Sequence, residues 1–257
     1  MNQVLNFGAA FAACCALMAS AVAAPEETGT EIRAVDARVL RVRLDGVIDL
    51  KIKQGPVPEL VILGEKRLLI KTITEQHGDT LSIGTETRNF KLSQRGNNLR
   101  AELTLPELRE VVSESVGRTD INGFSGDELE ISLDGAGSMR VNSNYRIVTA
   151  TLGGVGHMNI QGGNSEGIDL TLQGAGYVTL AGRSKWLKAS LGGLGGLDAQ
   201  HFQADTVNLD LSGLGNATVS ARQSATLNLS GMGSVTVFGK PVNRNVSVDG
   251  LGKVSWK

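Results

Sequence analysis

The chain has 257 residues, and its 25 basic and 26 acidic side chains leave a net charge of −1 at neutral pH. Because nucleic-acid-binding proteins concentrate positive charge on one surface, this balance argues against a nucleic acid as the partner. Both cysteines, Cys14 and Cys15, lie in a segment that we expect to be removed, which excludes disulfides and cysteine-ligated metals from the mature chain.

Residues 1–23 have the pattern of a signal peptide. An apolar run over residues 4–18 is followed by Ala21-Val-Ala23, an A-x-A cleavage pattern. The run is shorter than the roughly 20 apolar residues that a membrane span needs, so no transmembrane segment is expected after cleavage. We therefore predict export to the periplasm, the outer-membrane surface or the extracellular space. The residues before Cys14 weakly resemble a lipoprotein box, which leaves open whether Cys14 is a lipidation site.

Residues 24–107 form an N-terminal segment that is β-like but has no visible repeat. Apolar and charged residues alternate over residues 40–44 and 48–52, as they do in half-buried strands. Leu103-Thr-Leu-Pro106 is typical of a last strand, because proline suits a strand end. We expect this segment to cap or continue the repeats that follow.

Residues 108–257 repeat one phrase seven times: an aliphatic residue, any residue, Gly, an apolar residue and Gly. From the first glycine of the first copy, Gly135, to that of the last, Gly250, there are 115 residues in six steps, about 19 per step. This spacing is typical of a solenoid. The paired glycines are Gly135 and Gly137, Gly154 and Gly156, Gly174 and Gly176, Gly193 and Gly195, Gly213 and Gly215, Gly231 and Gly233, and Gly250 and Gly252. Ser115-Val-Gly117 begins an eighth, degenerate copy.

The residues between the glycine pairs alternate with a period of two. Upstream of the first pair, Leu129, Ile131 and Leu133 share one face, and the equivalent positions are apolar in the other copies. A helix is excluded because each glycine would cost it roughly 1 kcal/mol and the apolar period is not 3.6. The sequence therefore predicts an all-β solenoid of about eight coils of 18–20 residues, whose leucines share a dry interior.

The paired glycines are predicted to form the corners of the coils. Glycine there indicates either left-handed torsions or a contact between coils that leaves no room for a Cβ. The residue between the two glycines is always apolar: Ala136, Val155, Ala175, Leu194, Leu214, Met232 and Leu251. We expect a bend that turns this side chain into the corner, where it fills the interior. The alternative is an exposed apolar stripe, which would mark a partner surface.

The order of these features resembles a known family. A signal peptide, an early β segment, the entry strand at residues 103–108 and successive Leu-x-Gly-x-Gly-x-Val coils resemble the putative auto-transporter adhesin, head GIN domain family. The resemblance covers about residues 32–257. It implies a right-handed parallel β-helix, exported by bacteria, with a role in surface adhesion.

No catalytic, cofactor or metal site is predicted. In the outward column that begins at Glu130, carboxylates lie two coils apart, roughly 10 Å, which is too far to hold one ion directly. Asp169 and Lys188 lie in neighbouring coils of this column, and we expect an exposed ion pair. The three histidines, His77, His157 and His201, are far apart in the sequence and are expected on the surface.

Two classes of function remain. The first is an exported, non-enzymatic, adhesin-like scaffold that binds a glycan or protein of the cell envelope or surface. The alternative is a carbohydrate-binding or glycan-active, polysaccharide lyase-like β-helix, with Tyr177 and Trp186 as candidate glycan contacts. The final coil is expected to leave strand edges with unpaired backbone groups. Either charged side chains such as Arg244 and Lys257 protect these edges from pairing with another chain, or the edges support an end-to-end homo-oligomer.

Overall fold

The computed structural model describes residues 27–86 and 99–257. The predicted signal peptide, residues 1–23, and Cys14 lie outside the described residues. In the described part, no helix is long and apolar enough to span a bilayer.

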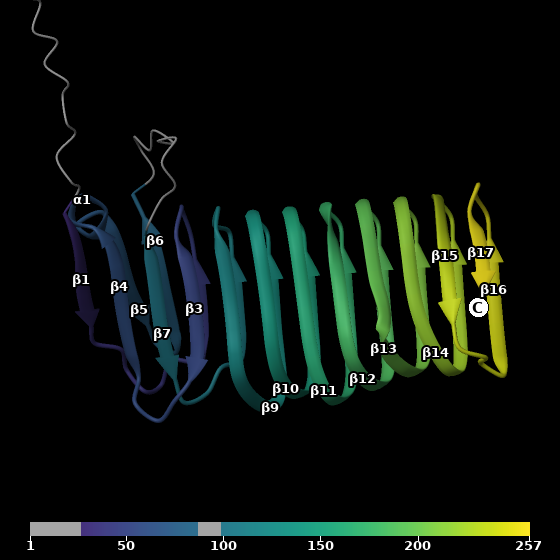
Figure 1. Ribbon diagram of the computed structural model, residues 1–257, viewed down its shortest axis with the longest axis horizontal. Coiled ribbons are helices and arrows are strands. Elements are labelled where there is room, and N and C mark those ends of the chain that lie inside the picture. Colours follow the sequence, from purple (N-terminus) through teal and green to yellow (C-terminus); the bar gives the residue numbers. More distant parts are fainter. Residues whose placement is uncertain (1–26, 87–98) are drawn as a thin grey trace, which may run out of the picture.

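The protein is a β-solenoid in which one long, bent strand makes one coil. Figure 1 shows these strands as a row of flattened coils, each curving at the lower edge before it returns. The coils are β9 (Arg118–Leu133), β10 (Ala136–Leu152), β11 (Val155–Leu172), β12 (Ala175–Leu191), β13 (Leu194–Leu211) and β14 (Leu214–Leu229). Each pairs in parallel with the next, so that Leu152 lies opposite both Leu133 and Leu172. The predicted fold class is confirmed.

The interior of the coils is a stack of aliphatic side chains. One leucine from each successive coil is buried here, namely Leu133, Leu152, Leu172 and Leu191. The residues two and four positions before each of these leucines are apolar and buried as well. Burying each such side chain stabilises the fold by about 1.5–3 kcal/mol. The predicted dry interior is confirmed.

The N-terminal segment builds further coils and closes one end of the solenoid. Its elements are β1 (Thr28–Arg33), β2 (Arg41–Leu44), β3 (Asp49–Gln54), β4 (Glu59–Glu65), α1 (Lys66–Leu69), β5 (Thr72–His77), β6 (Thr80–Thr85), β7 (Arg100–Leu105) and β8 (Glu110–Ser113). On one side β2 and β3 pair in parallel with β8 and β9, and on the other with β6 and β7. The coil nearer the N-terminus is thus sandwiched between two later ones. Strands β1, β4 and β5 add antiparallel pairs at this end.

One hydrophobic core runs through both predicted segments, from Val39 to Val237. It does not break near residue 107. The segment therefore both continues the coils and covers their first end.

The coil next to β14 consists of β15 (Met232–Phe238) and β16 (Asn243–Val248), and β17 (Lys253–Trp256) begins one more coil on β15. Among the described strands, β16 pairs with β14 alone and β17 with β15 alone. The guanidinium of Arg244 lies 4.6 Å from the ring centroid of Trp256, and Lys257 lies over Phe238. The end-to-end association stays a prediction.

The paired glycines lie where the backbones of successive coils approach most closely. A Cβ at Gly174 would collide with the carbonyl oxygen of Gly154, and one at Gly176 with that of Gly156. Among the paired glycines, Gly195 alone has a positive φ, 153°. The two explanations left open above are thus separated: lack of space, rather than left-handed torsions, accounts for glycine at nearly all these positions.

We predict that Gly174→Val is far more damaging than Gln173→Val. The first change forces side-chain atoms against the backbone of the preceding coil, and overpacking of this kind costs at least about 1–3 kcal/mol. Gln173 is exposed beside it, and a surface change is usually within about 0.5 kcal/mol. Thermal unfolding of the two variants measures the difference, and equal midpoints would contradict the close approach.

Candidate functional site

The apolar residue between each pair of glycines faces solvent. The exposed fractions are 62% for Val155, 57% for Leu194, 46% for Leu214 and 55% for Met232. The expectation that this side chain fills the corner from inside is therefore wrong. The alternation of faces continues without a break through the corner, so that the glycines occupy the inward positions and the residue between them points outward.

These side chains form one continuous row, which we call the corner row. Backbone pairing sets them side by side from coil to coil, for example Ala175 with Leu194 and Leu194 with Leu214. The corner row consists of Val116, Ala136, Val155, Ala175, Leu194, Leu214, Met232 and Leu251, all of them exposed. A shallow groove of about 570 Å³ follows its C-terminal part, from Ala175 to Leu251.

Three aromatic rings each lie over a glycine of a neighbouring coil. A Cβ at Gly196 would come within 2.9 Å of the ring of Tyr177, and one at Gly126 within 2.9 Å of the ring of Tyr145. A Cβ at Gly167 would collide with Trp186. In each pair the two residues are 19 apart (145−126, 186−167 and 196−177), which is one coil. This offset was visible in the sequence and was missed.

Tyr177 and Trp186, the candidate glycan contacts, lie in the two halves of β12 and are not brought together. Tyr177 is 45% exposed beside the corner row, and its ring lies nearly parallel to that of His157, with 6.1 Å between centroids. Burial, and then the negative charge of Asp198, raise the pKa of the Tyr177 phenol. Trp186 follows the bend at Gly182 and is partly covered.

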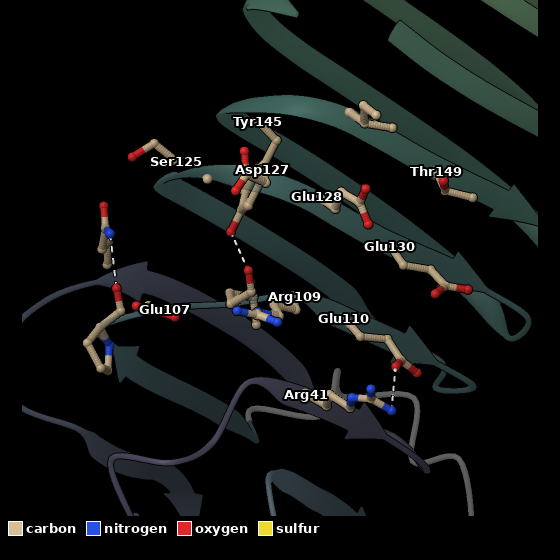
Figure 2. Close-up of a pocket in the computed structure, with 15 residues that line it drawn as sticks. Arg41, Glu107, Arg109, Glu110, Ser125, Asp127, Glu128, Glu130, Tyr145 and Thr149 are labelled. Carbon is tan, nitrogen blue, oxygen red and sulfur yellow. Dashed lines mark hydrogen bonds and ion pairs between the residues drawn. The ribbon is translucent and has the colours of Figure 1, made fainter. Parts of the chain in front are cut away.

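A second concave surface, of about 780 Å³, lies where the N-terminal coils meet β9 and β10 (Figure 2). Charged side chains from both sides line it, with Glu128 and Glu130 facing Arg109 and Glu110. Arg41 forms ion pairs of 3.5 Å with Glu110 and with Asp79. No group of three His, Cys, Asp or Glu side chains that could hold a metal ion occurs in the described part of the chain.

Tyr145 ties the two walls of this surface together. It reaches across Gly126, and its hydroxyl donates a hydrogen bond to the backbone carbonyl of Leu108. Figure 2 shows this bond bridging the gap between β10 and the segment that enters β8. Burial, and secondarily the charge of Glu107, raise the pKa of Tyr145 to about 12.

The bends opposite the corner row carry charges of alternating sign in successive coils. From β9 to β14 these are Asp127, Arg146, Glu166, Lys185, Asp205 and Arg222. The guanidinium of Arg146 lies 3.4 Å from the carboxylate of Asp127 and 2.7 Å from that of Glu166, whose pKa is lowered by this hydrogen bond. Exposed ion pairs contribute only about 0–1 kcal/mol each to the stability of the fold. The main effect of this row of charges is therefore to favour one register of the coils.

Two smaller expectations from the sequence are confirmed. The ammonium group of Lys188 lies 3.0 Å from the carboxylate of Asp169 in the neighbouring coil. His77, His157 and His201 are all exposed.

Comparison with known proteins agrees with the β-solenoid fold. The model of the family described as "Putative auto-transporter adhesin, head GIN domain" matches residues 40–241. No curated protein matches the sequence.

Solved structures with a similar fold include two putative adhesins. The one from Bacteroides fragilis has a TM-score of 0.67 and 19% identity, and the match covers 91% of this chain and 98% of that one. The one from Parabacteroides merdae has a TM-score of 0.75 and 16% identity, over 89% and 96% of the two chains. A putative lipid binding protein from Parabacteroides distasonis has a TM-score of 0.69 and 17% identity, over 88% and 96%. At such identities the likeness shows the fold alone.

We predict that Tyr145→Phe removes a stabilising hydrogen bond and a pH dependence. At neutral pH the lost bond costs about 1 kcal/mol. The folded-state pKa of Tyr145, about 12, lies above the unfolded value of about 10, so the unfolded chain releases this proton first. The stability that Tyr145 contributes is therefore complete below pH 10 and is lost as the pH rises to 12.

Unfolding of the native protein and of Tyr145→Phe, measured between pH 8 and 12, tests this. The native protein should be the more stable at pH 8, and its advantage should shrink toward pH 12. Tyr177→Phe is the matched control and should leave the pH dependence due to Tyr145 in place. An advantage that is constant with pH would show that the phenol is not protected by the fold.

Proposed function

Because the chain belongs to the putative auto-transporter adhesin, head GIN domain family, we propose that it is an exported, non-enzymatic binding module that makes its contact through the corner row. The family supplies the adhesin-like role. The corner row supplies the surface for it.

The exposure of the corner row carries this proposal. Single exposed apolar residues are ordinary on a protein surface, whereas a contiguous set marks an interaction site. Within the described residues, fourteen large hydrophobic side chains are exposed, and six of them belong to the corner row: Val116, Val155, Leu194, Leu214, Met232 and Leu251. Their clustering along one edge distinguishes the row from scattered exposure.

The solenoid also holds this row rigid before any partner arrives. From Ala136 onward, each member lies between two glycines whose backbones pack against the neighbouring coils, and the pairing register continues through the row. A surface that is already ordered loses little conformational entropy when it binds. A rod of this kind suits contact with an extended partner on an envelope or a cell surface.

Export is supported by the N-terminal sequence. The apolar run over residues 4–18 and the A-x-A pattern ending at Ala23 are those of a cleaved signal peptide. The compartment is then the periplasm, the outer-membrane surface or the extracellular space. Protease added to intact cells separates these locations, because it digests a displayed protein and spares a periplasmic one.

We predict that Leu194→Ser combined with Leu214→Ser abolishes most binding to cell envelopes without unfolding the protein. Both side chains are about half exposed, so their loss removes contact surface while costing the core little. The measurement is the fraction of purified protein that sediments with envelopes from cells lacking the gene. We expect at least a tenfold fall.

The matched control changes two outward-facing polar residues in the same coils, Asn208→Ser and Thr226→Ser. Asn208 and Thr226 lie opposite each other in β13 and β14, on the outer face rather than in the corner row. This variant should sediment like the native protein. If the corner-row variant sediments equally well, the row is not the contact surface.

A further inference from the structure

We propose that the C-terminal end of the solenoid is a surface suited to pairing with a second copy of this chain, and that Arg244 keeps it closed. Of the two alternatives that the sequence leaves open for this end, protection by charged side chains and end-to-end association, this is the first. The inference concerns one end of the rod, so it is independent of the binding role of the corner row.

The C-terminal end has two strand edges on which no further strand is stacked (Figure 1). Among the described strands, β16 pairs with β14 alone and β17 with β15 alone, so the outer backbone groups of β16 and β17 have no strand partner. All six residues of β16 are exposed. Edges of this kind are templates for pairing with another chain.

The apolar interior of the rod also reaches this end. The register places Val246 opposite Leu227 and Val248 opposite Leu229, and both leucines are buried. The two valines therefore point inward, but they are 40% and 42% exposed because no further coil covers them. The same end of a second copy would cover them, and such a contact uses one surface on both partners.

Arg244 occupies an inward position at this open end. Its neighbour in the register is Ala225, which is fully buried. The guanidinium carbon lies 4.6 Å from the ring centroid of Trp256, which points inward from β17, opposite the buried Val237. The indole face attracts a cation at this distance. The side chain of Arg244 thus reaches from β16 to β17 across the end of the interior.

An inward charge on an edge strand is one of the features by which proteins prevent edge-to-edge pairing. A second copy stacked on this end would enclose the guanidinium between two apolar interiors. In the part of the chain that the structure describes, Arg244 forms no ion pair with a carboxylate, and its printed hydrogen bond is to the carbonyl of Pro241. Because burying an unpaired charge is costly, Arg244 opposes the contact that the valines and strand edges favour.

The N-terminal end is closed by an arginine in the same way. On β1, Arg33 lies opposite the buried Leu60, so it also points inward. Its guanidinium donates hydrogen bonds to the carbonyl of Thr72, at 2.9 Å, and to the hydroxyl of Thr74, both in β5. Its side chain is only 19% exposed. Arg244 is held less firmly, and we therefore expect a single substitution to open the C-terminal end alone.

The test is the mass in solution of the mature chain and of Arg244→Val, measured by sedimentation equilibrium. Valine suits a strand and removes the inward charge. At a concentration on the order of 100 µM the native protein should be a monomer and the variant a dimer, with an association at least about tenfold stronger. Because the N-terminal end stays closed, association should stop at the dimer.

Lys253→Val is the matched control, because it removes one positive charge from the same end. Lys253 lies opposite Ser234 and faces outward, so this variant should stay monomeric. Adding Val246→Lys to Arg244→Val restores an inward charge on the same strand and should restore the monomer. Thermal unfolding checks that the coils of each variant are intact, and Arg244→Thr replaces the valine variant if that one does not fold.

A native protein that is dimeric, or a folded charge-free variant at position 244 that stays monomeric, would overturn the inference. So would larger assemblies, which require the N-terminal end to pair as well. Dimers formed by Lys253→Val, or by the native protein in about 1 M salt, would also overturn it, because net charge rather than the inward position of Arg244 would then keep the ends apart. Sedimentation with envelopes tests the corner row separately, so each proposal can fail while the other stands.

Discussion

The contact between backbones at the glycine corners is the constraint on which the rest of the structure depends. At Gly174 and Gly193 the position of a Cβ is taken by carbonyl oxygens of the preceding coil, so a larger residue there would hold the coils apart. Close stacking at the corner fixes the register that buries Leu172 and Leu191. The same contact leaves the residue between two glycines no inward position, and it therefore faces solvent. Core packing and surface chemistry thus follow from one local requirement.

The solenoid has two chemically different edges. The corner edge carries the apolar corner row, and the opposite bends carry the alternating charges from Asp127 to Arg222. The charged edge keeps one side of the rod hydrated, and its pairs favour a single register, because a slip by one coil would bring like charges together. A rod with these two edges presents a defined side to a partner, and Tyr177 lies on that side. The charged surface around Tyr145 lies at the junction with the N-terminal coils and serves to join them.

Much of this architecture could be predicted from the sequence, because it depends on a short period. The inward leucines and the Asp169–Lys188 pair follow from alternation and a coil length of about 19. The direction of residues such as Leu194 could not be decided, since it required knowing that the corner glycines occupy inward positions. Residues 41–54 pair on both sides with strands that come later in the chain. This pairing is non-local, and no repeat in the sequence indicates it. The aromatic–glycine pairs were present in the sequence, but they gain meaning only when rings such as Tyr177 are seen over their glycines.

Disulfide trapping tests most directly whether the corner residues of successive coils lie side by side on the outside. The mature chain is expected to have no cysteine. The two cysteines of a double variant such as Leu194→Cys with Leu214→Cys would therefore have no other thiol to pair with. Neighbouring coils are about 4.8 Å apart, within the range of about 4.4–6.8 Å between Cα atoms that a disulfide spans, whereas residues two coils apart are not. The account predicts rapid cross-linking of this pair under mild oxidation and none for Leu194→Cys with Met232→Cys. Equal cross-linking of both pairs, or none of the first, would contradict it.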